Sequence, residues 1–310
     1  MKKIVVLGAA GAVGLETSKN LINSDKYEVT LVDLNNKSSK KRLRKFEKKA
    51  NVIYGDVMDN NLLEKLVTTN DVIIYLVSIM PPFSNINANI SDAIELGSIK
   101  EIEKNINKYR PECHLIYCSD TTIYKSNEKD KFTVKSKVEL DDEYYYNNTK
   151  IKCEKLIKSK IKNYTIFRLP FVLSSIKNEP FMFNVNKKDI ISCITDCDAG
   201  RLFANSVEHL KEINNKIYNI DCGESFHFLF KDLVKDVIKR YGISKRMIVY
   251  KLFVFKKYYS PICKDGEEYS KIDDYSFDKY DNYLNRISYI SRKRFVKKFF
   301  GKIYLFLFNR

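Results

Sequence analysis

The chain has 310 residues, of which 44% are hydrophobic and 30% are charged, a composition that fits a soluble globular protein of one large domain or two smaller ones. It contains no run of the roughly 18 apolar residues that are needed to cross a bilayer, so we expect no membrane-spanning helix. The formal net charge is +16, and a little over half of that surplus lies after Gly242. A field of this size attracts nucleic acid, anionic lipid and anionic small molecules without distinguishing them.

The N-terminal sequence MKKIVVLGAAGAVG is similar to a secretion signal, but its glycine spacing and the periodic sequence after it favour a folded segment. Seven cysteines and three histidines include no CxxC pair, which argues against a disulfide framework and against a zinc site. We therefore expect a cytoplasmic protein with buried free thiols and without a metal.

The first elements predict a strand, a tight turn, a helix and a second strand. Residues 3–8 are a short apolar run that ends in glycine, 13–22 carry apolar residues at helical spacing, and 27–34 are typical of a strand. Further strands are predicted at 51–55, 71–78, 114–119, 164–170 and 216–221, and helices at 61–67, 89–108 and 148–161. This alternation predicts an α/β fold, a Rossmann-like doubly wound parallel sheet with a small C-terminal substrate-binding portion.

Three glycines follow the first predicted strand and lead into the first helix. Gly8, Gly11 and Gly14 form a GxxGxxG pattern, which lets the backbone turn sharply and approach a pyrophosphate. The amides at the start of the helix, including those of Ala12 and Val13, can bind that anion. The pattern predicts a dinucleotide site.

Asp33 supports this interpretation, because it stands 19 residues after Gly14 at the end of the second predicted strand. A carboxylate there accepts hydrogen bonds from the adenosine ribose and repels a 2′-phosphate, so NAD is favoured over NADP. The basic stretch 37–49 leaves NADP open, since Lys and Arg beside the ribose can offset that repulsion.

Tyr146 and Lys150 are four residues apart and share one face of a predicted helix. An ammonium group near a phenol favours the phenolate, and a positively charged nicotinamide favours it further. A tyrosine, whose ordinary pKa is about 10, can then act as an acid and base near neutral pH. The spacing therefore predicts a catalytic pair.

These motifs occur in the order and approximate spacing of the extended short-chain dehydrogenases/reductases. The chain resembles in particular the NAD-dependent nucleotide-sugar epimerases and dehydratases of that family, over residues 1 to about 243. The resemblance rests on GAAGAVG at 8–14, GDV at 55–57, DVIIYLVS at 71–78, IYCSDTTIY at 116–124, YNNTKIKCEKLI at 146–157, FRLP at 167–170, TDCDAGRLFANSVE at 195–208 and KIYNIDCGESFHF at 216–228. It implies that Asp56 and Val57 lie near the adenine, that Tyr146 is the catalytic acid and base, and that Lys150 binds the nicotinamide ribose.

The resemblance also implies a serine or threonine after the fifth strand, whose hydroxyl bonds the reacting oxygen. The usual offset, four residues before Tyr124, falls on Asp120, with hydroxyls on either side at Ser119 and Thr121. These two share a face of the strand, so we expect one of them to serve with a shift of one residue. The consecutive Thr, Asp and Glu of the dehydratases do not occur here, which disfavours sugar dehydration.

The resemblance divides the chain into three parts. Residues 1–170 form an NAD-binding Rossmann domain with the Tyr/Lys helix, 171–243 an interleaved substrate-binding portion, and 244–310 a basic, aromatic C-terminal extension. Within the extension, 291–310 predict a basic amphipathic helix, which can lie on an anionic membrane surface or pack on the domain or on a second subunit. We leave open a peripheral contact with the inner face of the membrane and a homodimer, and expect no nucleic-acid partner.

Together these features predict an NAD-dependent epimerase or oxidoreductase that acts on a nucleotide-activated sugar in polysaccharide biosynthesis. Tyr146 would remove a hydroxyl proton while a hydride passes to NAD. Two alternatives remain. One is an NAD(P)H-dependent keto-sugar reductase, and the other is a dinucleotide-binding sensor or scaffold without catalysis, which the aspartate at position 120 and the short segment between Arg168 and Asp198 favour.

Overall fold

The computed structural model describes residues 1–80, 84, 88–124, 132–140, 145–174, 188–240 and 260–293, apart from the side chains of residues 88, 238 and 288–293. Within these ranges seven strands form one parallel sheet in the order β3-β2-β1-β4-β5-β6-β9. The strands are β1 Lys2–Leu7, β2 Tyr27–Asp33, β3 Asn51–Tyr54, β4 Val72–Tyr75, β5 His114–Asp120, β6 Tyr164–Leu169 and β9 Lys216–Asn219. The predicted doubly wound α/β fold is confirmed.

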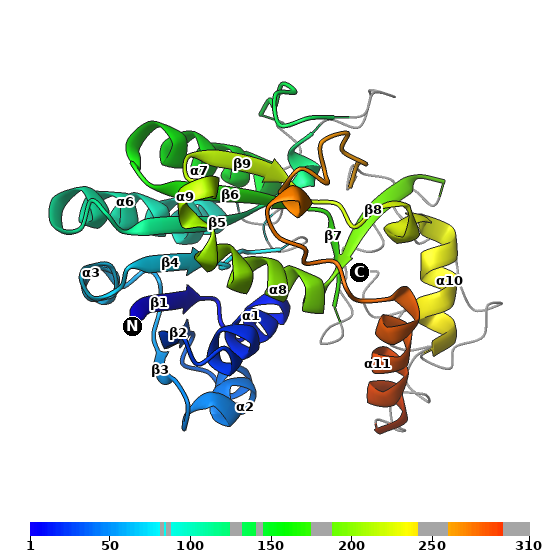
Figure 1. Ribbon diagram of the computed structural model, residues 1–310, viewed down its shortest axis with the longest axis horizontal. Coiled ribbons are helices and arrows are strands. Elements are labelled where there is room, and N and C mark those ends of the chain that lie inside the picture. Colours follow the sequence, from blue (N-terminus) through cyan, green and yellow to red (C-terminus); the bar gives the residue numbers. More distant parts are fainter. Residues whose placement is uncertain are drawn as a thin grey trace.

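A second, smaller sheet is built from β7 (Phe171–Leu173), β8 (Ile190–Thr195) and β10 (His227–Leu229). In it β8 pairs parallel with β7 and antiparallel with β10. Helices flank both sheets, and Figure 1 shows α10 and α11 side by side, away from the large sheet. The helices are α1 Ala12–Asn23, α2 Lys37–Leu43, α3 Asn60–Thr69, α5 Ala88–Ser91, α6 Gly97–Tyr109, α7 Tyr145–Lys160, α8 Asp196–Asn205, α9 Leu210–Ile213, α10 Phe230–Arg240 and α11 Tyr280–Lys293.

The large sheet is buried on both faces, which explains the uninterrupted apolar run of its first strand. Alternate residues of β1 point to opposite sides. Ile4 and Val6 pack in the core cluster that includes α1 and α8, whereas Val5 and Leu7 pack in the cluster that includes α3 and α6. Two layers of helices therefore hold the sheet between them (Figure 1).

The strand order reverses between β1 and β4, and the carboxyl ends of parallel strands on either side of such a point frame a ligand crevice. Gly8 follows β1 directly, and Asp120 is the last residue of β5. The predicted strand at 71–78 ends earlier than expected, at Tyr75, because the backbone of Leu76 and Val77 lies against Gly8. The fold thus brings the glycine loop next to the ends of β4 and β5.

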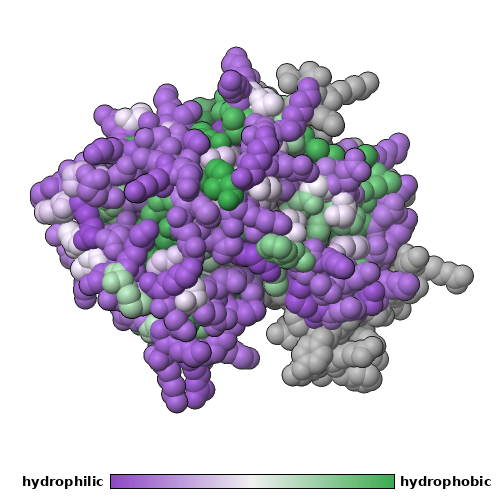
Figure 2. All heavy atoms as spheres, in the orientation of Figure 1, coloured by the Kyte–Doolittle hydropathy of each residue, from purple (hydrophilic) through white to green (hydrophobic). Residues whose placement is uncertain are grey.

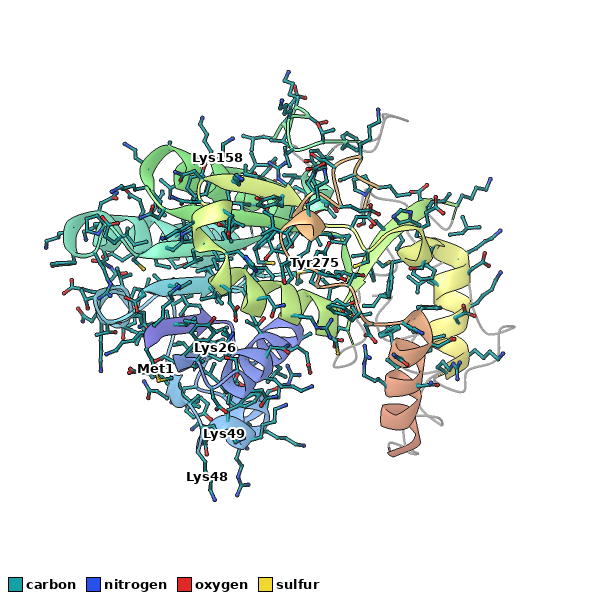
Figure 3. All side chains as sticks on the ribbon, viewed as in Figure 1. Met1, Lys26, Lys48, Lys49, Lys158 and Tyr275 are labelled. Carbon is teal, nitrogen blue, oxygen red and sulfur yellow. The ribbon has the colours of Figure 1, made fainter. Side chains whose placement is uncertain are left out.

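The last predicted part, 244–310, is not a separate appendage in the portion that the structure covers. Tyr269 and Tyr275 are completely buried in the same core cluster as β1, and Figure 3 shows Tyr275 in the interior, while Lys48 and Lys49 project outward. The Tyr275 hydroxyl donates to the Asp221 carbonyl at 2.7 Å. Part of the predicted extension thus packs on the core of the large sheet, and the domain limits at 170 and 243 stay predictions.

The surface in Figure 2 is mainly hydrophilic, with scattered apolar side chains, as the high charge predicts. Among the described residues no helix is long and apolar enough to span a membrane. The predicted amphipathic helix lies outside the described residues from residue 294 onward. Contact with a membrane and formation of a homodimer stay predictions.

Candidate active site

The glycine loop packs tightly enough to require its glycines. Gly8 has a φ of +83°, a conformation that L side chains rarely adopt, and its N–H donates to the Val32 carbonyl at 3.0 Å. A Cβ on Gly14 would stand 2.2 Å from the Gly8 carbonyl oxygen. The start of α1 therefore sits directly on the loop. No side chain caps this helix at Gly11, so the amides that follow, including those of Ala12 and Val13, suit an anion.

Asp33, the last residue of β2, is hydrogen-bonded to the same loop. One carboxylate oxygen accepts the Ala10 N–H at 2.8 Å, and the other accepts the Leu34 N–H and the Ser39 hydroxyl. A carboxylate has about four acceptor positions, so these three hydrogen bonds leave capacity for a ribose hydroxyl. Arg42 of α2 also reaches the loop and donates to the Ala10 carbonyl at 2.9 Å.

The two residues that the resemblance places near the adenine follow β3. Gly55 donates its N–H to the Asp33 carbonyl at 3.0 Å, so the ends of β2 and β3 lie together. Asp56 is exposed and accepts the Met58 N–H, whereas Val57 is buried in the core. The predicted cofactor residues thus surround one edge of the sheet, although their role stays a prediction.

Tyr146 and Lys150 lie one turn apart at the start of α7, with both side chains buried. The Lys150 ammonium is 5.7 Å from the centre of the Tyr146 ring. Tyr146 also packs in a cluster with Phe171 and Leu173 of the small sheet, so it stands where the two sheets meet. The structure brings the predicted pair together, facing the end of β5.

Lys150 has a buried partner that sequence analysis missed. Its ammonium donates to the Glu95 carboxylate at 2.6 Å and to the Cys118 carbonyl at 2.9 Å. Burial lowers the pKa of Lys150, but Glu95, together with Cys118 and Cys153, raises it, and the net effect is a pKa above the ordinary value. Glu95 belongs to a π-helical segment, Asp92–Leu96, and such segments frequently occur at functional sites.

Asp120 faces the tyrosine. The Tyr146 hydroxyl donates to Oδ2 of Asp120 at 3.1 Å, and Oδ1 accepts the Thr122 N–H at 2.8 Å. Burial raises the pKa of Asp120 above its ordinary value, against the opposing effect of the Thr122 hydrogen bonds and of Lys150. Asp120, which stands four residues before Tyr124, is therefore the residue that contacts Tyr146, at the offset where the resemblance implies a serine or threonine.

Ser119 and Thr121, the two hydroxyls predicted for the third catalytic position, have other partners among the described residues, and their catalytic role stays a prediction. Ser119 donates to Glu154 at 2.6 Å, two turns further along α7 than Tyr146. Thr121 instead lies 3.4 Å from the hydroxyl of Ser260. Because side chains alternate along β5, the same register that points Asp120 at Tyr146 directs its neighbours elsewhere.

Glu154 belongs to a buried ion pair below the site. Arg168 donates to both of its carboxylate oxygens, at 2.9 and 2.6 Å, and to the Tyr124 hydroxyl at 2.5 Å. The spacing of Glu154, four residues after Lys150 on the same helical face, was the one signal that could have revealed it. This bidentate pair fixes α7 on β5 and β6.

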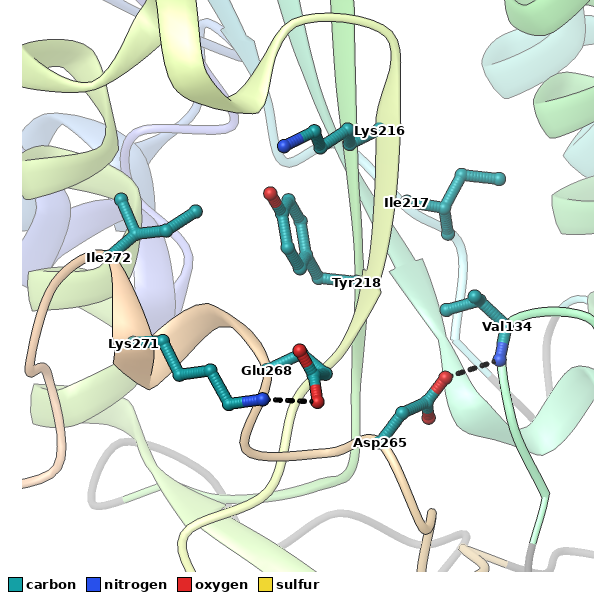
Figure 4. A pocket seen from close by; sticks show the side chains of 8 residues that line it. All are labelled: Val134, Lys216, Ile217, Tyr218, Asp265, Glu268, Lys271 and Ile272. Atoms are coloured by element: carbon teal, nitrogen blue, oxygen red, sulfur yellow. Dashed lines mark hydrogen bonds and ion pairs between the residues drawn. The ribbon is translucent and has the colours of Figure 1, made fainter.

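A pocket at the outer edge of the large sheet is separate from these residues. Figure 4 shows its lining, which comes from β9 and from two segments distant in sequence. The lining residues are Val134, Lys216, Ile217, Tyr218, Asp265, Glu268, Lys271 and Ile272. It includes none of the predicted cofactor or catalytic residues.

The seven cysteines are all free, and the described residues contain no cluster of His, Cys, Asp or Glu that could hold a metal.

Comparison with protein families finds one match. The model of the 3-beta hydroxysteroid dehydrogenase/isomerase family matches residues 5–166, which is more than half of the chain. No protein in a search of curated sequences matches.

Solved structures with the same fold are numerous. One is the dTDP-glucose 4,6-dehydratase from Bacillus anthracis in complex with NAD, with a TM-score of 0.75, 16% identity and coverage of 95% of this chain and 97% of that one. Another is the UDP-glucuronic acid 4-epimerase from Bacillus cereus in complex with UDP-glucuronic acid and NAD, with a TM-score of 0.74, 17% identity and coverage of 94% and 99%. The UDP-Glc/GlcNAc 4-epimerase from Campylobacter jejuni has a TM-score of 0.74, 14% identity and coverage of 94% and 100%. At such identities the likeness concerns the fold.

Proposed function

This chain belongs to the 3-beta hydroxysteroid dehydrogenase/isomerase family of extended short-chain dehydrogenases/reductases, and we propose that it is an NAD-dependent epimerase or oxidoreductase acting on a nucleotide-activated sugar. The observation that carries the proposal is the buried Tyr146 and Lys150 pair, which lies beside the end of β5. The structurally similar dTDP-glucose 4,6-dehydratase in complex with NAD and UDP-glucuronic acid 4-epimerase in complex with UDP-glucuronic acid and NAD support the same cofactor and substrate class.

The residues present fit NAD. The amides after Gly11 and the close approach at Gly8 suit the pyrophosphate, and Asp33 retains acceptor capacity for the adenosine ribose. Asp56 and Val57 stand beside Asp33 at the next strand end, where the adenine would lie. Bound NAD would supply a hydride acceptor and donor.

Two residues of α7 would take part in the reaction. Tyr146 exchanges a proton with the reacting hydroxyl or ketone. Lys150 has three N–H donors, of which the described residues engage two, so one remains for the nicotinamide ribose. Neither role needs a metal.

The test is turnover of sugar nucleotides by the purified protein. We expect conversion of at least one of UDP-glucose, UDP-glucuronic acid and dTDP-glucose in the presence of NAD, measured by chromatography of the products. Tyr146→Phe and Lys150→Met should reduce turnover about 100-fold or more. Tyr145→Phe is the matched control, because that neighbouring tyrosine is 40% exposed and should leave turnover unchanged.

The outcomes separate the proposed enzyme from its alternatives. Recycling of NAD during turnover supports an epimerase, whereas stoichiometric consumption of NADH or NADPH identifies a keto-sugar reductase. Protein that binds NAD, converts no sugar nucleotide and does not respond to either variant would be a sensor or scaffold, and the proposal would be wrong. Mass spectrometry of small molecules released from the purified protein tests the cofactor and the substrate together.

A further inference from the structure

The direct partner of the proposed catalytic tyrosine is a buried carboxylate. Asp120 is 8% exposed and Tyr146 is 3% exposed, and the phenol donates to Oδ2 at 3.1 Å. A serine or threonine in this position can donate or accept a hydrogen bond, but it does not retain an extra proton near neutral pH. An aspartate accepts hydrogen bonds when it is ionised and has an O–H donor when it is protonated, so the exchange changes what this position can do chemically.

The charged groups around the pair leave the proton of Tyr146 to this carboxylate. Lys150 approaches from α7, but Glu95 pairs with it at 2.6 Å, so the two charges compensate one another. Cys118, two residues earlier on β5, has a pKa that burial raises to about 12, so its thiol stays protonated near neutral pH. The carboxylate of Asp120 is therefore an acceptor in direct contact with the phenol.

Burial also suits Asp120 to this task. Its pKa is raised, chiefly by desolvation, so its carboxylate is a better base than an exposed one. In a reaction that removes a proton and later returns it, the same side chain can act first as the base and then as the acid.

We propose that Asp120 is a catalytic residue that takes the proton of Tyr146 while Tyr146 takes the proton of the substrate hydroxyl. This inference rests on the proposed function. The substrate O–H bond breaks as the O–H bond to Oη of Tyr146 forms, and the former phenol proton moves to Oδ2 of Asp120. The C–H bonding pair leaves as the hydride that the proposed function already requires, and a ketone results. Reduction reverses each transfer, and Tyr146 is a neutral phenol before and after.

Two variants test the proton transfer by kinetics. Asp120→Asn keeps the shape but cannot accept the proton, and Asp120→Ser restores a hydroxyl that can hydrogen-bond but cannot retain it. We expect both to reduce turnover about 100-fold or more, with the affinity for NAD unchanged within about threefold. Asp59→Asn is the control, because this exposed residue caps α3 through its side chain and asparagine caps equally well. A variant with wild-type turnover would overturn the proposal.

A measurement without cofactor or substrate tests the same coupling. The infrared absorption of the neutral Asp120 carboxyl is isolated as the difference between wild-type and Asp120→Asn protein and followed during acid titration. Tyr146→Phe removes a hydrogen bond to the ionised carboxylate, so we expect the midpoint to move to higher pH, whereas Tyr145→Phe should leave it in place. An unchanged midpoint in Tyr146→Phe would contradict the proposal.

The two measurements also separate the inference from the proposed function. If no sugar nucleotide is converted but the midpoint moves, the proton pair exists and the proposed substrate class is wrong. If turnover occurs and Asp120→Asn retains it, the proposed function stands and the role of Asp120 is wrong.

Discussion

The ammonium group of Lys150 and the carboxylate of Glu95 lie 2.6 Å apart, with side chains that are 3% and 1% exposed. Both oxygens of Glu95 have further partners, since the Tyr117 hydroxyl donates to one at 2.5 Å and Ser78 to the other at 3.2 Å. A buried pair of this kind contributes little net stability relative to apolar side chains, but loss of one partner leaves an uncompensated charge. Glu95 therefore positions the lysine of the proposed catalytic pair.

Replacing Glu95 by alanine should destabilise the protein strongly. The buried Lys150 ammonium then lacks its carboxylate, and we expect the free energy of unfolding to fall by about 3–5 kcal/mol, measured by urea denaturation. Glu268→Ala breaks the exposed pair with Lys271 and should cost less than about 1 kcal/mol. Similar losses for the two variants would mean that Lys150 finds another partner or loses its charge.

Replacing Gly14 by alanine should disrupt the glycine loop. The new Cβ would stand 2.2 Å from the Gly8 carbonyl oxygen and 2.9 Å from Cα of Ala9, and backbone atoms cannot move aside easily. We expect a loss of about 1–3 kcal/mol in stability and at least about a tenfold weaker affinity for NAD, measured by calorimetry.

Gly97→Ala is the matched control for that substitution. Gly97 has helical angles, φ −62° and ψ −49°, and an added Cβ would meet its nearest atom at 3.9 Å. Alanine is the better helix former, so this variant should gain about 0.5–1 kcal/mol. The two substitutions should change stability in opposite directions, because only Gly14 is tightly packed. Equal changes in stability would refute that explanation.

The dinucleotide preference should depend on Asp33 and Arg42. Asp33→Ser removes the carboxylate that repels a 2′-phosphate, while Arg42 remains at the loop through its bond to the Ala10 carbonyl. We expect the ratio of NADP to NAD affinity to rise about tenfold or more, and the additional change Arg42→Ala to cancel that gain. Glu28→Gln removes an exposed charge from the same strand and should leave the ratio unchanged.

Asp120 should make stability depend on pH. Its folded pKa lies above the ordinary 3.8, so the folded state binds the proton more tightly than the unfolded state. The resulting stabilisation is fully present below pH 3.8 and is lost as the pH rises through the folded pKa, with a slope of at most about 1.4 kcal/mol per pH unit. Urea denaturation over a pH series should therefore show wild type losing stability relative to Asp120→Asn as the pH rises. If the difference in free energy of unfolding between wild type and Asp120→Asn does not change with pH, or changes in the opposite direction, burial does not dominate the pKa of Asp120.

Much of the fold and part of the site could be predicted from local sequence. Strands with apolar side chains on both faces, helices at a period of 3.6 residues, the glycine pattern and Asp33 all depend on neighbours along the chain. Tyr146 and Lys150 were predictable as a pair for the same reason, because residues four apart on a helix share a face. These features follow from backbone geometry.

The partners of that pair depended on tertiary structure. Glu95 lies 55 residues before Lys150, in a helical stretch whose sequence marks no acidic residue as special. The choice of Asp120 over Ser119 and Thr121 required the register of β5 against α7, since a shift of one residue turns a different side chain toward Tyr146.

The sequence by itself therefore determined the sheet, the glycine loop and the helical face that carries the tyrosine and lysine, because each is a local pattern. The packing of distant segments decided which buried carboxylates face those two residues and placed Tyr269 and Tyr275 in the core. The physical reason is that the partner of a buried charge must lie close to it in space. Residues that are close in space can be far apart in the sequence, so no short sequence pattern reveals them.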